Sequence, residues 1–264
     1  MKIKTDENDY YARIKELNIS HYREEISYYT QAPLRQVEKK ILTSINKGLR
    51  ILDVGCGPGR FSIEAARMGY NITGLDITSA AITAARSKAK NLELDNIHFL
   101  VGDMTHMPFN DNKFDYVFCV RFSINAIATF QRRQKVISEM VRVVKQGGIV
   151  YIESFNKFYL GRGLFLVLKN ILTDIQRKIS ILWCYLIKKR YFGLLPGDII
   201  YKSNKVAEAP VGYAHLPTIF ELMKLLPNKT LYKFYSILQI TKEKVLDFLK
   251  YFRYSIWIFL IKPK

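Results

Sequence analysis

The chain is poor in cysteine, and the three cysteines that it has lie far apart. Cys56, Cys119 and Cys184 form no C-x-x-C pair, and an odd number does not suit a set of disulfides. A disulfide framework and a zinc site are therefore excluded as the basis of the fold. We expect a protein of the reducing cytoplasm that holds no metal.

Long apolar runs are also missing. No stretch of about 18 uninterrupted apolar residues occurs, so a transmembrane helix is not expected. The opening residues 1–18 are polar and charged, and they contain no apolar segment of the kind that a secretory signal requires. Apolar residues nevertheless make up 49% of the 264 residues, which is enough for one large buried core.

Acidic side chains are scarce relative to basic ones. The chain has 23 Asp and Glu against 41 Lys and Arg, a net charge of +18. Residues 1–156 carry +5 (22 basic against 17 acidic), whereas residues 157–264 carry +13 (19 against 6). The second part therefore predicts an anionic partner, which could be nucleic acid, a membrane surface or an acidic substrate. A basic, solvated surface without a partner is the alternative.

Short apolar runs alternate with amphipathic segments between residues 48 and 156. The order of strand and helix predicts a parallel sheet with helices on both faces. Right-handed crossovers bring the carboxyl ends of the strands to one edge, where ligands of such sheets bind. The pattern predicts strands at 50–54, 71–76, 97–103, 114–120 and 149–156, and helices at 60–69, 78–94 (N-cap Thr78 or Ser79) and 132–145.

This alternation stops after residue 157. Apolar residues recur at spacings of three and four between 164 and 186, with Lys and Arg between them, which predicts a basic amphipathic helix. A looser stretch follows up to Pro217. Thr218 and Glu221 then have the spacing of a capping box at the start of another helix. The remaining residues predict strands at 230–240 and 253–263 around a short helix at 241–250.

The stretch "ILDVGCGPGRFS" (51–62) places three glycines directly after the first strand. Gly55, Gly57 and Gly59 would allow a tight turn and a close approach of a ligand, and the following helix would point its free N–H groups at that ligand. The dinucleotide fingerprint G-x-G-x-x-G is one residue longer, so this stretch fits it poorly. An ordinary turn is the alternative.

Two carboxylates at strand ends sharpen the interpretation. Asp76 ends the second strand, where it could bind two ribose hydroxyls, and Asp103 ends the third, where it could accept from an exocyclic amine. The ordered series "LDVGCGPG", "GLD", "GDMTHMPFNDNKFDYV" and "EMVRVVKQGGIVYI" resembles the class I S-adenosylmethionine-dependent methyltransferases. The resemblance covers residues 48–156 and is specific for the fold and the cofactor.

The resemblance implies a role for each matching residue. A solvated loop aspartate is the alternative for Asp103, and a plain core residue is the alternative for Val120. The implied cofactor-binding residues are Gly55, Gly57, Gly59 and Asp53 around the methionine part, Asp76 at the ribose, Ile77 and Met104 against the adenine, Asp103 at its amine, and Val120 beside the sulfonium.

The same resemblance implies one Rossmann-like, doubly wound α/β domain over residues 1–264. Its mostly parallel sheet would have seven strands, the last of them antiparallel, with an α-helical insertion after the fifth strand. We expect a helical cap at 1–47, the cofactor-binding core at 48–156, a basic insertion and substrate lid at 157–229, and the last two strands at 230–264.

A narrower resemblance concerns three short motifs. "APLR" (32–35), "FCV" (118–120) and "ESFN" (153–156) before an amphipathic insertion resemble the quinone-biosynthesis O-methyltransferases. This likeness implies that Arg35 contacts the cofactor, where its guanidinium could pair with the methionine carboxylate. It also implies that the insertion faces a membrane. An arginine on a helix surface is the alternative.

Methyl transfer to oxygen or nitrogen can require a base as well as alignment and exclusion of water. His215 in "GYAHLP" is the predicted catalytic residue, because it precedes the helix that abuts the substrate cleft in relatives. A histidine bonded locally at a helix entry is the alternative, and His106 falls at a variable loop position. Core packing is the alternative for the aromatic residues that could wall the cleft, Tyr28, Tyr29, Phe122 and Tyr213.

Two kinds of nucleic-acid methylation are excluded. Residues 119–125, "CVRFSIN", lack the N/D-P-P-Y motif of the amino-methylating enzymes, and Cys119 lies inside a strand with no proline before it. We therefore predict methyl transfer to an oxygen or nitrogen of a small, apolar or membrane-associated acceptor, with membrane contact through 160–192. The alternatives are an RNA- or protein-directed methyltransferase, which keeps nucleic acid open as a partner, and a non-catalytic module that binds the cofactor.

Overall fold

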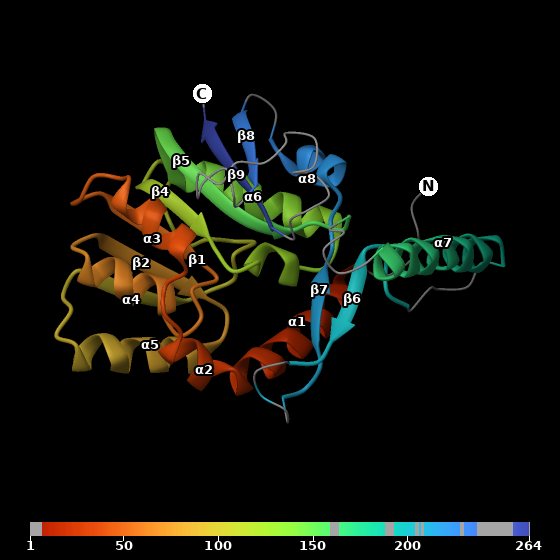
Figure 1. Cartoon of the computed structure of the whole chain (residues 1–264), viewed down its shortest axis with the longest axis horizontal. Helices are drawn as coiled ribbons and strands as arrows, with labels where there is room; N and C mark the ends of the chain where they lie inside the picture. Colours follow the sequence, from red (N-terminus) through yellow and green to blue (C-terminus); the bar gives the residue numbers. More distant parts are fainter. Residues whose placement is uncertain are drawn as a thin grey trace.

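A central sheet with helices on both faces forms the body of the molecule (Figure 1). The computed structural model describes residues 7–158, 164–187, 193–203, 206, 209–227, 230–236 and 256–263. The main sheet has the order β3–β2–β1–β4–β5–β9–β8. Its strands are β1 (Arg50–Val54), β2 (Asn71–Asp76), β3 (Ile97–Val101), β4 (Phe114–Cys119), β5 (Val144–Phe155), β8 (Thr230–Ser236) and β9 (Ile256–Pro263).

Strands β1 to β5 are parallel to one another, whereas β9 runs antiparallel to both β5 and β8. The expectation of a mostly parallel, Rossmann-like sheet with an antiparallel last strand is therefore confirmed. Strand β1 pairs with β2 on one side and with β4 on the other, so the chain reverses its direction of winding there. Ligands of open α/β sheets bind at such a switch point.

The side chains of the strands alternate between two hydrophobic cores. Ile51 of β1 packs with α4 (Arg60–Arg67) and α5 (Ser79–Asn91), and the adjacent Leu52 packs with α6 (Phe130–Val143) and α8 (Ile219–Leu225). Both residues are fully buried. A strand buried on both faces is apolar at consecutive positions, which explains the sequence "RILDV".

Three helices precede the sheet: α1 (Glu7–Glu24), α2 (Ile26–Gln31) and α3 (Gln36–Thr43). Between α2 and α3 the chain is non-helical around Pro33, as proline predicts. Helix α1 lies beside β7 (Gly212–His215) (Figure 1). Asn18 fixes it there, since its side chain donates to the carbonyl of Ala126 and accepts from the N–H of Tyr213.

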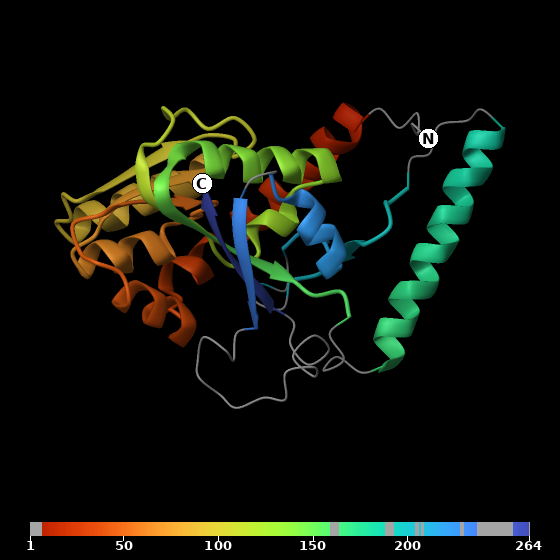
Figure 2. The same cartoon turned by 90° about the horizontal axis from the view of Figure 1, so that it is seen from above.

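The insertion after β5 contains a helix and a hairpin. Helix α7 (Leu164–Leu186) is the predicted amphipathic segment, and Figure 2 shows it as a separate rod beside the body. Strands β6 (Asp198–Tyr201) and β7 form an antiparallel pair where we expected a looser stretch. Each strand has only four residues, too few for a clear alternation in the sequence. Within the described residues, no helix is both long and apolar enough to cross a bilayer.

The predicted boundary between the third helix and the fifth strand is wrong. We expected the helix to end at residue 145 and the strand to begin at 149, with Gly147 and Gly148 between them, but α6 ends at Val143 and β5 already begins at Val144. The glycines instead form an irregularity within β5, where the register with β4 shifts. Gly147 has φ +74°, and a Cβ on Gly148 would lie 2.7 Å from the carbonyl oxygen of Asp115, so both positions require glycine.

The helix starts agree only in part with the predicted caps. The hydroxyl of Thr218 accepts from the N–H of Glu221, as a capping box requires, but the Glu221 carboxylate binds elsewhere. Thr78 occupies the N-cap position of α5, but its side chain makes no capping hydrogen bond to the helix. The predicted helix at 241–250 lies outside the described residues.

We predict that Phe118→Ala lowers the free energy of unfolding by about 3–5 kcal/mol, because it opens a cavity in the core. Phe118 is 1% exposed and its ring lies 5.2 Å from that of Phe61 and 5.5 Å from that of Tyr151. Urea unfolding would measure the loss. Phe220→Ala is the control, because that side chain is 70% exposed. Equal losses in the two variants would contradict the assignment of Phe118 to the core.

Candidate functional site

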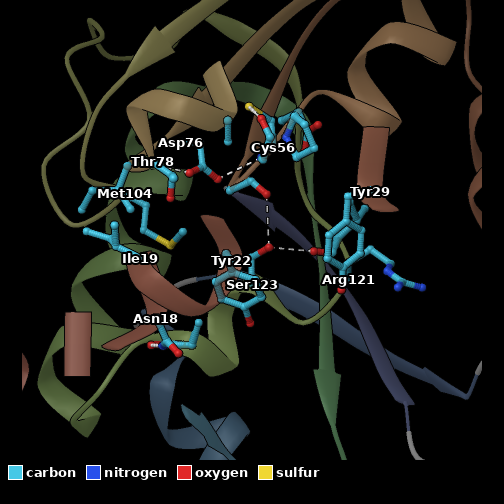
Figure 3. Close-up of a pocket in the computed structure, with 18 of the residues that line it drawn as sticks. Asn18, Ile19, Tyr22, Tyr29, Cys56, Asp76, Thr78, Met104, Arg121 and Ser123 are labelled. Atoms are coloured by element: carbon cyan, nitrogen blue, oxygen red, sulfur yellow. Dashed lines mark hydrogen bonds between the residues drawn. The ribbon is translucent and has the colours of Figure 1, made fainter. Parts of the chain in front are cut away.

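A cleft of about 1100 Å³ lies at the carboxyl ends of β1, β2 and β4, between the glycine turn and helix α1. Figure 3 shows the side chains that face into it. Helix α1 contributes Tyr11, Lys15, Asn18, Ile19 and Tyr22 to this lining, and the sheet edge contributes Asp53, Gly55, Gly57, Asp76, Ile77, Asp103, Met104, Val120, Arg121 and Ser123.

The turn after β1 has a backbone that only glycine adopts easily. Gly55 and Gly57 have φ values of +73° and +54°. A Cβ on Gly55 would lie 2.7 Å from that of Ser123, whereas nothing lies within 4 Å of the corresponding position at Gly57. The backbone at Gly57 therefore faces open space, as a close approach of a ligand requires. Gly59 is the N-cap of α4 and packs against Phe99, outside the cleft lining.

Asp53 ends β1 directly before this turn and is fully buried. Its Oδ2 accepts from the hydroxyl of Ser62 at 2.6 Å, and its Oδ1 has no hydrogen-bond partner among the described residues. Burial raises the pKa of Asp53 to about 7. An unpartnered acceptor at the edge of a cleft is costly unless a ligand satisfies it, so Asp53 suits a cationic or hydrogen-bond-donating group.

Asp76 binds the glycine turn from the end of β2. Its Oδ2 accepts from the N–H of Gly57 at 2.9 Å, and its Oδ1 accepts from the N–H of Thr78 at 2.8 Å (Figure 3). Burial raises the pKa of Asp76, although the hydrogen bonds from Thr78 and Gly57 oppose this effect. Each carboxylate oxygen retains further acceptor capacity, so the side chain could also bind two hydroxyl groups.

Asp103, at the end of β3, connects the sheet edge to helix α1. Its Oδ2 accepts from the ammonium of Lys15 at 3.0 Å and from the hydroxyl of Tyr11 at 3.2 Å, and its Oδ1 accepts from the N–H of Thr105. Burial raises the pKa of Asp103, but the hydrogen bonds from Thr105 and Lys15 outweigh it and hold the pKa below its usual value. Met104 follows and faces the same cleft (Figure 3).

Residues after β4 form the opposite end of the cleft. The hydroxyl of Ser123 donates to the carbonyl of Val120 at 2.9 Å, which stabilises the turn. The guanidinium of Arg121 lies 5.4 Å from the centre of the Tyr29 ring. Figure 3 shows this pair at the far side of the cleft from Asp76. Nearby, Tyr22 is bonded to the hydroxyl of Tyr201 at 3.1 Å, and burial raises the pKa of Tyr22 well above its usual value.

Arg35 does not line this cleft. Its guanidinium binds the carboxylates of Glu38 and Glu153 at 2.6 and 2.5 Å, and Glu38 also binds Arg60. The carboxylates of Glu38 and Glu153 are buried, and their ion pairs join α3, α4 and β5. The expected contact between Arg35 and the methionine carboxylate is thus not supported, because the guanidinium is already paired within the protein.

His215 also lies outside the cleft lining. It is 3% exposed, and its Nδ1 and Nε2 lie 2.7 and 2.8 Å from carboxylate oxygens of Asp198 and Glu221. The structure therefore does not bring the predicted catalytic histidine to the residues that we expect to bind the cofactor. Instead it matches the alternative of a histidine bonded locally near a helix entry.

Other wall and lid residues are placed differently from expectation. Of the four aromatic residues proposed as walls, Tyr29 lines the cleft, but Tyr28, Phe122 and Tyr213 do not. We predicted that residues 157–229 form a lid over the substrate, but none of the described residues in this range lines the cleft. Helix α7 therefore does not cover it. The cover is α1 instead. The sequence showed the tyrosines of this helix but not which of its faces covers the cleft. That orientation depends on contacts with distant residues, such as the ion pair between Lys15 and Asp103.

Comparisons with known proteins agree with this geometry. The family described as "Methyltransferase domain" matches residues 45–205. Demethylmenaquinone methyltransferase from Listeria welshimeri is 33% identical over 127 residues, which are 47% of this chain and 51% of that protein. Sterol 24-C-methyltransferase from Schizosaccharomyces pombe is 37% identical over 107 residues, which are 40% of this chain and 27% of that protein. The chain thus spans about half the length, or less, of the curated relatives it matches.

Solved structures show the same fold at lower identity. A methyltransferase from Methanosarcina mazei that depends on S-adenosylmethionine is 23% identical, with a TM-score of 0.60 over 88% of this chain and 99% of the other. The CcbJ methyltransferase from Streptomyces caelestis is 10% identical, with a TM-score of 0.65 over 93% and 99%. The family match over most of the chain shows that the protein belongs to the methyltransferase-domain family, and the solved structures show that it has the fold of a methyltransferase that depends on S-adenosylmethionine.

Proposed function

We propose that the protein transfers the methyl group of S-adenosylmethionine to an oxygen or nitrogen atom of a small, apolar or membrane-associated acceptor. The main support for this proposal is that the cleft is covered on several sides. Ile19 and Tyr22 of α1 cover the cleft, and Tyr29 and Arg121 close its far end (Figure 3). A cleft that is covered in this way and has a largely apolar lining suits a small molecule.

The cofactor would lie against the glycine turn. The open backbone at Gly57 would approach its methionine part, and the unpartnered Oδ1 of Asp53 would accept from the ammonium group. Asp76, with acceptor capacity to spare, would hold the ribose hydroxyls, and Ile77 and Met104 would contact the adenine. When bound, the sulfonium of S-adenosylmethionine supplies an electrophilic methyl group.

Asp103 can bind the adenine amine only if its present hydrogen bonds change. Both of its oxygens already accept from Tyr11, Lys15 or Thr105. A hydrogen bond from the adenine amine would therefore compete with the contacts that hold α1 over the cleft. We infer that cofactor binding and the position of α1 are coupled through this carboxylate.

The acceptor would occupy the end of the cleft near Arg121. Arg121 makes no ion pair with a carboxylate of the described residues, so its guanidinium remains available to an anionic oxygen. No histidine is among the described residues that line the cleft. An acceptor oxygen that ionises against Arg121 would need no separate base, and the chain would then contribute alignment and exclusion of water.

The relatives bear on the choice of acceptor. The names of the Listeria and Schizosaccharomyces proteins refer to a quinone and a sterol, both apolar molecules. The sterol enzyme is named for transfer to carbon, so carbon stands beside oxygen and nitrogen as the attacked atom. RNA or protein as the acceptor is the alternative, and the basic charge of residues 157–264 is its only support.

Helix α7 supports a membrane-associated acceptor. It exposes one apolar stripe, in which Phe165, Ile179 and Trp183 are 81%, 61% and 62% exposed. Its single acidic residue, Asp174, is buried and binds Lys157. A helix with an apolar face and exposed cations suits the surface of an anionic bilayer. We propose that the protein works in the cytoplasm and contacts a membrane through this helix.

Labelled-methyl transfer from S-adenosylmethionine into separated lipid, RNA and protein fractions of a cell extract would test the function. We expect label in the lipid fraction, and we expect Arg121→Met to lower kcat/KM about 10- to 100-fold, since it removes a charged hydrogen bond. Arg67→Met is the control, because Arg67 lies on the outer surface of α4. Label confined to RNA or protein would contradict the proposal.

The pKa of Asp53 predicts how stability depends on pH. The folded protein holds a proton on this carboxyl up to about pH 7, whereas the unfolded chain loses it near 3.8, so the free energy of unfolding should fall as pH rises between these values. The size of this fall is on the order of a few kcal/mol. Urea unfolding of the wild type and of Asp53→Asn between pH 5 and 8 would measure the difference.

Cofactor binding should reduce the dependence of stability on pH. If an ammonium group pairs with Asp53, saturating S-adenosylmethionine should offset the loss of stability in the wild type but not in Asp53→Asn. The same pH profile in both proteins, with and without the cofactor, would show that Asp53 holds neither the proton nor the ammonium group.

Vesicle flotation would test the membrane contact. We expect binding to vesicles that contain phosphatidylglycerol, weaker binding at high salt, and a loss on Leu168→Asp or Trp183→Ala, because each removes apolar surface from the exposed stripe. Ser180→Asp adds the same charge to α7 outside the stripe and should bind almost as the wild type does. Equal losses in Leu168→Asp and Ser180→Asp, with no loss in Trp183→Ala, would indicate that charge alone mediates binding.

A further inference from the structure

A second cavity lies under α7, apart from the cofactor cleft. Phe130 and Arg133 of α6, Ile181 and Leu182 of α7, and the residues around Pro196 line it, and its volume is about 410 Å³. It shares no lining residue with the cleft. This volume is within the range of sites that bind small molecules.

The cavity exists because α7 is attached to the body on only one part of its inner face. Asp174 accepts from the N–H of Gly197 at 2.8 Å, and Arg177 donates to the carbonyl of Asp198 at 2.6 Å. One turn further along, Ile181 is 6% exposed and borders the cavity. The polar contacts therefore hold the helix in place, while its next turn borders the cavity.

A chain of polar groups forms the floor of this space. Asp198 accepts from the hydroxyls of Tyr10 and Tyr213 and faces Nδ1 of His215, whose Nε2 faces Glu221. Glu221 also accepts from Arg133 at 2.9 Å. Both carboxylates thus have cationic or donor partners within the protein, and they do not require a cation from outside.

Arg133 has a donor that the protein leaves unused. It is 3% exposed, and its Nε–H has no hydrogen-bond partner among the described residues, although its other nitrogens bind Glu221 and the carbonyl of Ile127. A buried, charged donor without an acceptor is costly. Lys178 adds a second positive charge at the cavity. Glu221 balances the charge of Arg133, so the unused Nε–H and the ammonium group of Lys178 are the groups that would bind an anionic head.

The other walls are apolar. Phe130, Ile181, Leu182, Leu195 and Pro196 supply them. A small inorganic anion would leave these walls in contact with water, whereas a molecule with an alkyl chain would cover them. The two parts of the lining fit a ligand with an anionic head and an apolar chain.

We propose that this cavity binds an alkyl carboxylate, with its head at Arg133 and Lys178 and its chain along the inner face of α7. The site is separate from methyl transfer, and it does not depend on the acceptor proposed above. An occupant of this kind would complete the packing of α7 against the body, since the chain would fill the space that the helix spans.

Titration calorimetry of the full chain with decanoate, below its micelle concentration, would test the site. We expect saturable binding, and we expect acetate and decan-1-ol to bind at least about tenfold more weakly, because one lacks the chain and the other lacks the charge. Decan-1-ol binding as tightly as decanoate would overturn the anionic head, and acetate binding as tightly would overturn the alkyl chain.

A matched pair of variants on α7 locates the binding. Ile181→Trp should fill the cavity and weaken decanoate binding about tenfold or more, whereas Ile179→Trp places the same side chain on the exposed stripe and should leave it unchanged. Arg133→Lys keeps the charge but removes the Nε donor, and should also weaken binding. The affinity for S-adenosylmethionine, unchanged in all three, reports the fold. Equal decanoate affinity in Ile181→Trp and Ile179→Trp would overturn the proposal.

Discussion

The tight backbone turn after β1 is the constraint on which the site depends. Gly55 and Gly57 adopt positive φ values there, and the turn lies at the switch point of the sheet, where β1 pairs with β2 on one side and β4 on the other. A side chain at Gly55 would collide with Ser123, so the turn can approach the segment after β4 only because it carries none. The cleft opens above this contact, and every wall is positioned relative to it.

Burial gives three aspartates at the same sheet edge different properties. Asp53 is fully buried with one free oxygen, and its pKa is raised to about 7. Asp76 accepts a hydrogen bond from the backbone of the turn. Hydrogen bonds from Thr105 and Lys15 lower the pKa of Asp103 and so favour its ionised form. Asp53 thus has an acceptor oxygen without a partner among the described residues, Asp76 stabilises the glycine turn, and Asp103 attaches α1 to the sheet. The residue type is the same in each case, and the partners decide the role.

Partners also explain why two predicted residues lie elsewhere. Arg35 and His215 are residue types that often bind ligands, but here their charged or polar atoms are taken up by Glu153 and Glu38 and by Asp198 and Glu221. Glu38 and Glu221 lie close to them in the sequence, but Glu153 and Asp198 lie on other elements, so the sequence could not reveal the full set of partners. The basic insertion is a similar case, since α7 is an amphipathic helix as expected but does not cover the cleft.

The sequence by itself determined the alternation of strands and helices, the position of the glycine turn, and the edge of the sheet at which Asp76 and Asp103 lie. These features depend on local periodicity and on residues at the ends of strands, which the chain carries in order. Only the tertiary structure decided that α1 covers the cleft, that Arg121 and Tyr29 close it, and that α7 spans a second cavity. Those features depend on which distant surfaces meet, and the physical reason is that burial and ion pairing between segments far apart leave no periodic trace in the sequence.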